Sequence, residues 1–164
     1  MYISETYGKL NIEQIPEKLK DFYDKMKSYD TGIQVIIGTD SQTSHDTKIV
    51  NVIAIICEGH GGIYFYETSH VDKIMDLRQK LYKETELSLN AADRLLESIE
   101  SEKKYEELFD NTTFTIHVDA GKTEKSKTRE LIPAIVGWIK GQGYESCVKP
   151  DSFVASTIAD RISK

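Results

Sequence analysis

Two aspartates each end a short, strongly apolar run of the chain, and this placement makes them candidates for chemistry. Asp40 ends Ile33–Asp40 (IQVIIGTD), and Asp119 ends Phe114–Asp119 (FTIHVD). Such runs are typical of buried strands, and a carboxylate at a strand's carboxyl end can project into the crevice where open α/β sheets bind ligands. Two close carboxylates repel unless a proton or cation intervenes, and oxygen ligands suit Mg²⁺ or Mn²⁺. We expect a shared metal site; ordinary turn chemistry is the alternative for each aspartate.

A third carboxylate is expected from a long helix. Apolar positions recur with a period of 3.6 from about residue 73 to residue 101. At 100° per residue, Glu84 falls about 20° from this apolar stripe, whereas Glu86 points to the opposite side. A buried carboxylate is costly unless it pairs or binds a cation, so Glu84 is the candidate ligand. The alternative is that Glu84 lies at the edge of the stripe beside Lys80 or Lys83.

The C-terminal segment offers two further acids. Asp151 follows Pro150, where an acid commonly caps a helix or occupies its first turn. Asp160 lies near the far end of a helix expected over residues 151–162, and it is the stronger candidate for the site. Considered alone, Asp160 would be an ordinary surface acid.

Imidazole and ammonium groups lie next to Asp119 in the sequence. His117 is two residues earlier and should share the same strand face, so we expect it to support the site or transfer a proton; a hydrogen-bonded buried histidine is the alternative. The following loop, GKTEKSKTR, is basic. Lys122 and Lys127 are its candidates for contacting a substrate phosphate, and a solvated loop is the alternative.

The stretch HVDAGKT, at residues 117–123, matches the nucleotide-binding loop of translational GTPases almost letter for letter. A GxxxxGK loop needs a small residue at its first position so that the backbone can wrap the phosphates, and this chain has Ile116 there. No DxxG or NKxD motif follows. The sequence therefore argues against a GTPase.

The order of the predicted elements brings these residues into one sheet. Helices are expected over about 12–28, 73–101, 128–140 and 151–162, and strands over 33–40, 48–57, 63–68, 114–119 and 147–149. The first three strands are joined by short turns and form an antiparallel meander, and the later strands pair in parallel. The pattern predicts an α/β fold with a mixed five-stranded sheet, helices on both faces and an extra N-terminal helix.

Composition narrows the class of protein. The 164 residues fit one domain over 1–164, with 1–31 as a helical extension. No leader-like or membrane-spanning segment is evident, which predicts a cytoplasmic protein without a membrane partner. Cys57 and Cys147 lack metal-ligand spacing and should be buried. The net charge of −6 disfavours non-specific electrostatic binding to duplex nucleic acid. Nothing in the sequence indicates an oligomeric state.

Four segments together resemble one family of bacterial proteins. They are GTDSQ at Asp40, KETELSLNAADRLL on the long helix, IHVDAGKTEKSKT around Asp119, and the closing KPDSFVASTIAD. This combination resembles the YkuK-like family, which is assigned to the ribonuclease-H-like superfamily. The resemblance runs from about Gly32 to the C-terminus. It implies a three-layer ribonuclease-H-like fold.

The resemblance also implies a site. In ribonuclease H, four acids bind two Mg²⁺ ions, and by resemblance these roles fall on Asp40, Glu84, Asp119 and Asp160, with Asp151 as an alternative to the last. The implied activity is that of a divalent-metal-dependent nuclease acting on RNA or DNA. The alternative is a non-catalytic ribonuclease-H-like module that binds RNA or a protein partner. The acidic net charge favours that alternative, and a fold does not by itself establish chemistry.

Overall fold

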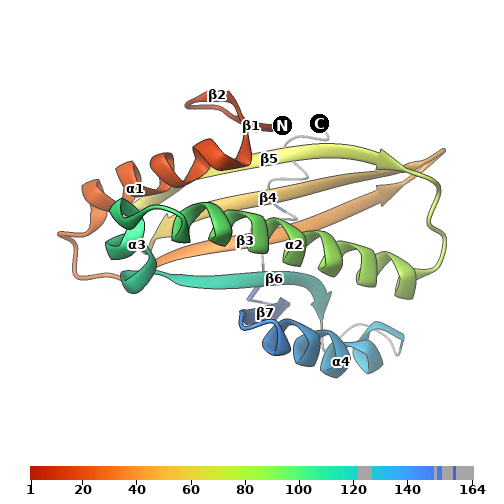
Figure 1. The fold of residues 1–164 in the computed structure, drawn as a ribbon. Coiled ribbons are helices and arrows are strands. Elements are labelled where there is room, and N and C mark those ends of the chain that lie inside the picture. Colours follow the sequence, from red (N-terminus) through yellow and green to blue (C-terminus); the bar gives the residue numbers. More distant parts are fainter. Residues whose placement is uncertain (122–126, 150, 153–156, 158–164) are drawn as a thin grey trace.

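The protein was analysed as a computed structural model that describes residues 1–121, 127–149, 151–152 and 157 (Figure 1). Its strands are β1 (Tyr2–Ser4), β2 (Gly8–Leu10), β3 (Ile33–Thr43), β4 (Thr47–Cys57), β5 (Gly61–Val71), β6 (Thr113–Gly121) and β7 (Glu145–Lys149). Its α-helices are α1 (Ile15–Met26), α2 (Leu77–Glu100), α3 (Glu106–Asn111) and α4 (Lys127–Gly141), and two short 3₁₀ helices are η1 (Ile12–Gln14) and η2 (Lys103–Tyr105).

The strands form one mixed sheet in the order β2-β1-β5-β4-β3-β6-β7. Strands β3, β4 and β5 are an antiparallel meander, and β6 and β7 add to β3 in parallel. The predicted meander followed by parallel strands is therefore confirmed. The prediction of five strands is wrong, because the N-terminal hairpin β1–β2 adds two more beside β5.

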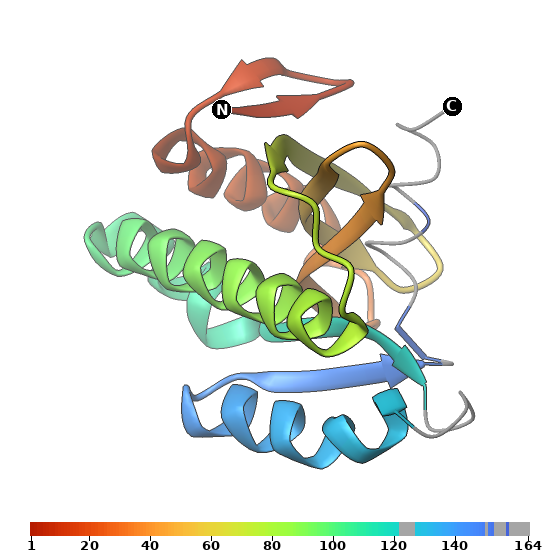
Figure 2. The ribbon, with the colours of Figure 1, turned by 90° about the vertical axis from the view of Figure 1, so that its right-hand side faces the viewer.

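The described helices pack on one face of the sheet (Figure 2). Val35 and Ile37 of β3 share a core with Leu19 of α1, Leu95 of α2 and Ile135 of α4. Ile36 belongs instead to a smaller apolar cluster, because successive residues of a strand point to opposite faces. The sequence predicted helices on both faces; the helix expected over residues 151–162 falls almost wholly outside the described residues.

Helix α2 crosses the sheet and positions the site (Figure 1). The side chain of Asp76 caps its first turn by accepting a hydrogen bond from the Arg78 backbone N–H at 3.1 Å. The buried stripe of α2 includes Leu81, Glu84 and Ser88. Among the described residues, no helix is long and apolar enough to cross a membrane.

Candidate metal centre

Asp40 and Asp119 come from neighbouring parallel strands. The last paired residues of β3 and β6 are Gly38 and His117, and each aspartate lies two residues beyond its strand's member of that pair. The two carboxylates therefore project from the same face of the sheet. Burial, and after it the negative charge of Asp119, raise the pKa of Asp40 to about 6. The two acids are electrostatic neighbours, as their placement in the sequence predicts.

Glu84 reaches the same region from α2. Its side chain is 8% exposed, and its Oε1 accepts a hydrogen bond from Ser41 Oγ at 2.5 Å. Burial is the main cause that raises the pKa of Glu84 to about 8, and the charges of Asp40 and Asp119 add to it. Glu86 is exposed and lies 3.2 Å from Lys83 Nζ. The helical-wheel prediction of which glutamate faces the sheet is therefore correct.

Ser41 connects two of these acids, and the sequence analysis missed it. Its backbone N–H donates to Asp40 Oδ1 at 2.9 Å, while its hydroxyl donates to Glu84. The signal was present in the sequence: Ser41 follows Asp40 on a strand, so its side chain must point to the opposite face, toward α2. One residue thus orients carboxylates that approach from two sides.

Asp119 has a cationic neighbour and an unsatisfied oxygen. Its Oδ1 lies 2.9 Å from Lys149 Nζ, on β7. This oxygen is buried, yet no described group donates to it with hydrogen-bond geometry, so the lysine offers charge without a directed bond. A buried carboxylate oxygen in this state costs free energy unless a further donor or cation meets it.

His117 is buried beside the acids. It is 6% exposed and lines a narrow crevice together with Glu84 and Asp119. Burial lowers the pKa of His117 to about 4, because the charged imidazolium is poorly solvated there. The ring is therefore neutral at pH 7, which makes it a hydrogen-bonding group and not a local positive charge.

Comparison with known proteins identifies the family of the chain. A family model described as "Ribonuclease H-like" matches residues 14–164. The chain belongs to the ribonuclease H-like family. It is also 30% identical over 181 aligned positions to the "Uncharacterized protein YkuK" of Bacillus subtilis (strain 168), across 100% of this chain and 97% of that protein. No solved structure gives a significant match. The resemblance drawn from the motifs is confirmed.

Several predicted residues of this ribonuclease H-like chain have no described position. Asp160 and Lys122 lie outside the described residues, and Lys127 is described only as the first residue of α4. Asp151 is exposed in the turn after β7, where its backbone N–H donates to the Val148 carbonyl at 3.0 Å. The neighbouring Ser152 hydroxyl donates to the Val118 carbonyl at 2.8 Å, which ties this turn to β6.

The described acids fit a divalent cation in their chemistry. Among the described residues, no three His, Cys, Asp or Glu side chains are grouped in a way that could hold a metal ion. The donors nevertheless suit a hard cation: two carboxyls have raised pKa values, and Asp119 keeps a buried oxygen without a hydrogen bond. A cation would favour the charged forms of Asp40 and Glu84, which burial and the neighbouring negative charges now oppose.

Proposed function

We propose that this ribonuclease H-like protein hydrolyses phosphodiester bonds in RNA or DNA with Mg²⁺ or Mn²⁺. Asp40, Glu84 and Asp119 would hold the metal, and Asp160 is proposed as the fourth acid. The observation that supports the proposal is electrostatic: burial, together with the charges of these acids on one another, raises the pKa of Asp40 to about 6 and that of Glu84 to about 8. A cluster of this kind is expected where a cation binds, because the bare acids cannot all ionise at low cost.

When bound, divalent ions in such a site lower the pKa of water and stabilise the charge of the leaving oxygen. The protein's own groups then have distinct tasks. Ser41 holds Asp40 and Glu84 in place through its two hydrogen bonds. Lys122 or Lys127 would offset charge on the phosphate, and neutral His117 would orient a carboxylate or a water molecule.

The first test measures metal binding by calorimetry with Mn²⁺. Asp40→Asn and Asp119→Asn should each weaken binding by at least tenfold, because each removes a charged ligand. Glu86→Gln is the matched control, since this exposed glutamate lies two residues from Glu84 on the same helix. Unchanged Mn²⁺ affinity in both aspartate variants would refute the assignment.

The second test measures cleavage of labelled RNA, DNA and hybrid substrates of several lengths. The wild-type protein should cut at least one class with Mn²⁺ or Mg²⁺ and none with EDTA, and Asp40→Asn should be inactive. Binding without cleavage across the whole panel would favour a non-catalytic module. The net charge of −6 favours this alternative, which is why the test measures binding as well as cleavage.

A further inference from the structure

A groove of about 500 Å³ lies on the helix-covered face of the sheet, the face toward which Ser41 points. It opens between α2 and the strands β4, β5 and β1. Across the meander, Ser41 pairs with Ile49 and Ile49 pairs with Ser69, so the groove continues the row of residues that begins at Ser41. Adjacent strands are about 4.8 Å apart, which places Ser69 about 10 Å from Ser41. Neighbouring nucleotides of one strand can bridge such a distance.

The lining of the groove combines apolar surface with amide groups. The half-buried Leu87 supplies apolar surface above the buried Ile49 and Ala91, and the exposed Asn90 supplies an amide beside the buried Asn51. Apolar contact on a base face and amide hydrogen bonds to its edge are the usual means by which proteins hold an unpaired base.

The amide of Asn51 is fixed before any ligand arrives. Its Oδ1 accepts from the Tyr2 hydroxyl at 2.7 Å, and its Nδ2 donates to Thr39 Oγ1 at 2.8 Å. The chain of hydrogen bonds continues from Thr39 Oγ1 to Ser88 Oγ at 2.7 Å. The wall of the groove is thus joined by hydrogen bonds to the strand and helix that carry Asp40 and Glu84.

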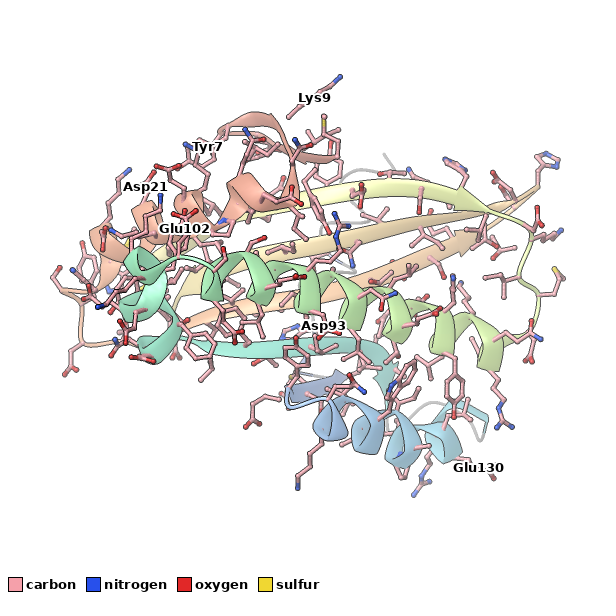
Figure 3. The ribbon with its side chains drawn as sticks, viewed as in Figure 1. Tyr7, Lys9, Asp21, Asp93, Glu102 and Glu130 are labelled. Atoms are coloured by element: carbon pink, nitrogen blue, oxygen red, sulfur yellow. The ribbon has the colours of Figure 1, made fainter. Side chains whose placement is uncertain are left out.

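One cation at the groove is available to an anion. Arg94 is exposed at its lining, and among the described residues no ion pair or hydrogen bond engages its guanidinium group. Two acids line the groove as well, and each has a partner: Glu67 pairs with the amino group of Met1. Asp93, labelled on α2 in Figure 3, accepts a hydrogen bond from the Tyr144 hydroxyl at 2.7 Å. A guanidinium without a partner, beside apolar and amide surface, suits a phosphate attached to a base.

We infer that this groove binds one unpaired nucleotide of the substrate strand, with its base against Leu87 and Asn90 and its phosphate on Arg94. The inference rests on the proposed nuclease function and specifies its substrate as single-stranded. A base inside a duplex stays stacked on its neighbours and cannot enter, whereas a single strand presents both its base faces and its edges.

The test measures binding separately from cleavage. Fluorescence anisotropy with a short labelled single strand and its duplex would be recorded in the Asp119→Asn background with Mg²⁺, over a range of salt concentrations. Arg94→Ala should weaken single-strand binding about tenfold, as expected for a charge-assisted hydrogen bond. It should also reduce the slope of log K against log salt by about 0.7, the value for one lost phosphate contact on a single strand.

Two comparison variants make the result specific. Asn90→Ala should weaken binding without changing the salt slope, because it removes an uncharged contact. Lys25→Ala removes one positive charge from the exposed last turn of α1 and should change neither quantity. Unfolding temperatures of all variants should match that of the Asp119→Asn protein.

The inference would be overturned if Arg94→Ala had the same single-strand affinity and salt slope as the Asp119→Asn protein. Equal affinity for the single strand and the duplex would also overturn it. Failure of the proposed function would look different. In that case the wild-type protein would cleave nothing with Mn²⁺, while the Arg94→Ala effect on binding would persist.

Discussion

The carboxyl group of Glu84 links the stability of the metal-free protein to pH. Its pKa rises from 4.5 to about 8 on folding, mainly through burial. Between these values the folded state binds more protons than the unfolded state, so the free energy of unfolding falls as pH rises. This contribution is complete below about pH 4.5 and is lost progressively through pH 8. Between pH 5 and pH 8, its loss is on the order of 3 kcal/mol.

Glu84→Gln should therefore be less sensitive to pH than the wild-type protein. Urea unfolding in EDTA at several pH values checks this, and the variant should be the more stable protein at pH 8. Glu86→Gln, on the exposed side of α2, should follow the wild-type curve. Parallel curves for Glu84→Gln and the wild-type protein would show that Glu84 is not protonated in the folded state.

At the scale of residues, local sequence located the acids but not their partners. Asp40 and Asp119 were predictable because each ends an apolar run, although the strands continue to Thr43 and Gly121. The orientation of Glu84 followed from helical geometry. The Ser41–Glu84 hydrogen bond joins residues 43 positions apart, so its pairing depends on where α2 crosses the sheet. Lys149 meets Asp119 only because β7 pairs with β6. Such contacts follow from topology and not from spacing.

At the scale of elements, the longer strands and helices were predictable and the shortest were not. The apolar strands β3 and β4 and the long amphipathic α2 each contain several periods of their pattern. Strands β1 and β2 have three residues each, too few to show alternation, and the charged segment around η2 and α3 hid Tyr105 and Leu108, which are buried. The hairpin β1–β2 is held by contacts with residues far away in the sequence, among them the hydrogen bond from Tyr2 to Asn51.

Tyr2→Phe should loosen this hairpin. The lost hydroxyl leaves the buried Oδ1 of Asn51 without its donor, which costs about 1–3 kcal/mol of unfolding free energy. Hydrogen exchange should become faster in β1 and in the facing residues of β5. Tyr29→Phe is the control, because Tyr29 is 47% exposed. Loss of this hydroxyl should change neither the unfolding free energy nor the hydrogen exchange. Unaltered exchange in Tyr2→Phe would mean that apolar packing alone holds β1 in the sheet.

At the scale of the whole molecule, the negative net charge disfavours the nucleic-acid binding that the proposed function requires. A net charge of −6 repels a polyanion, so under the proposed function affinity for nucleic acid would come from a few local cations and from the proposed metal. The family-level fold was predictable because its motifs span most of the chain. The chemistry of the candidate site was harder to predict, because it depends on how β3, α2 and β6 are arranged and on which of their acids are charged.

Metal binding should consequently stabilise the entire fold. Asp40, Glu84 and Asp119 come from β3, α2 and β6, so an ion held by all three can bind the folded state but not the separated segments. At a Mn²⁺ concentration of about 100 times Kd, linkage adds about 2.7 kcal/mol, which for a chain of this length raises Tm by about 5 to 10 °C. Differential scanning calorimetry with Mn²⁺ and with EDTA measures the shift. Asp40→Asn should lose most of it, while Glu86→Gln should retain it. An equal shift in the Asp40→Asn protein would place the stabilising ion elsewhere on the molecule.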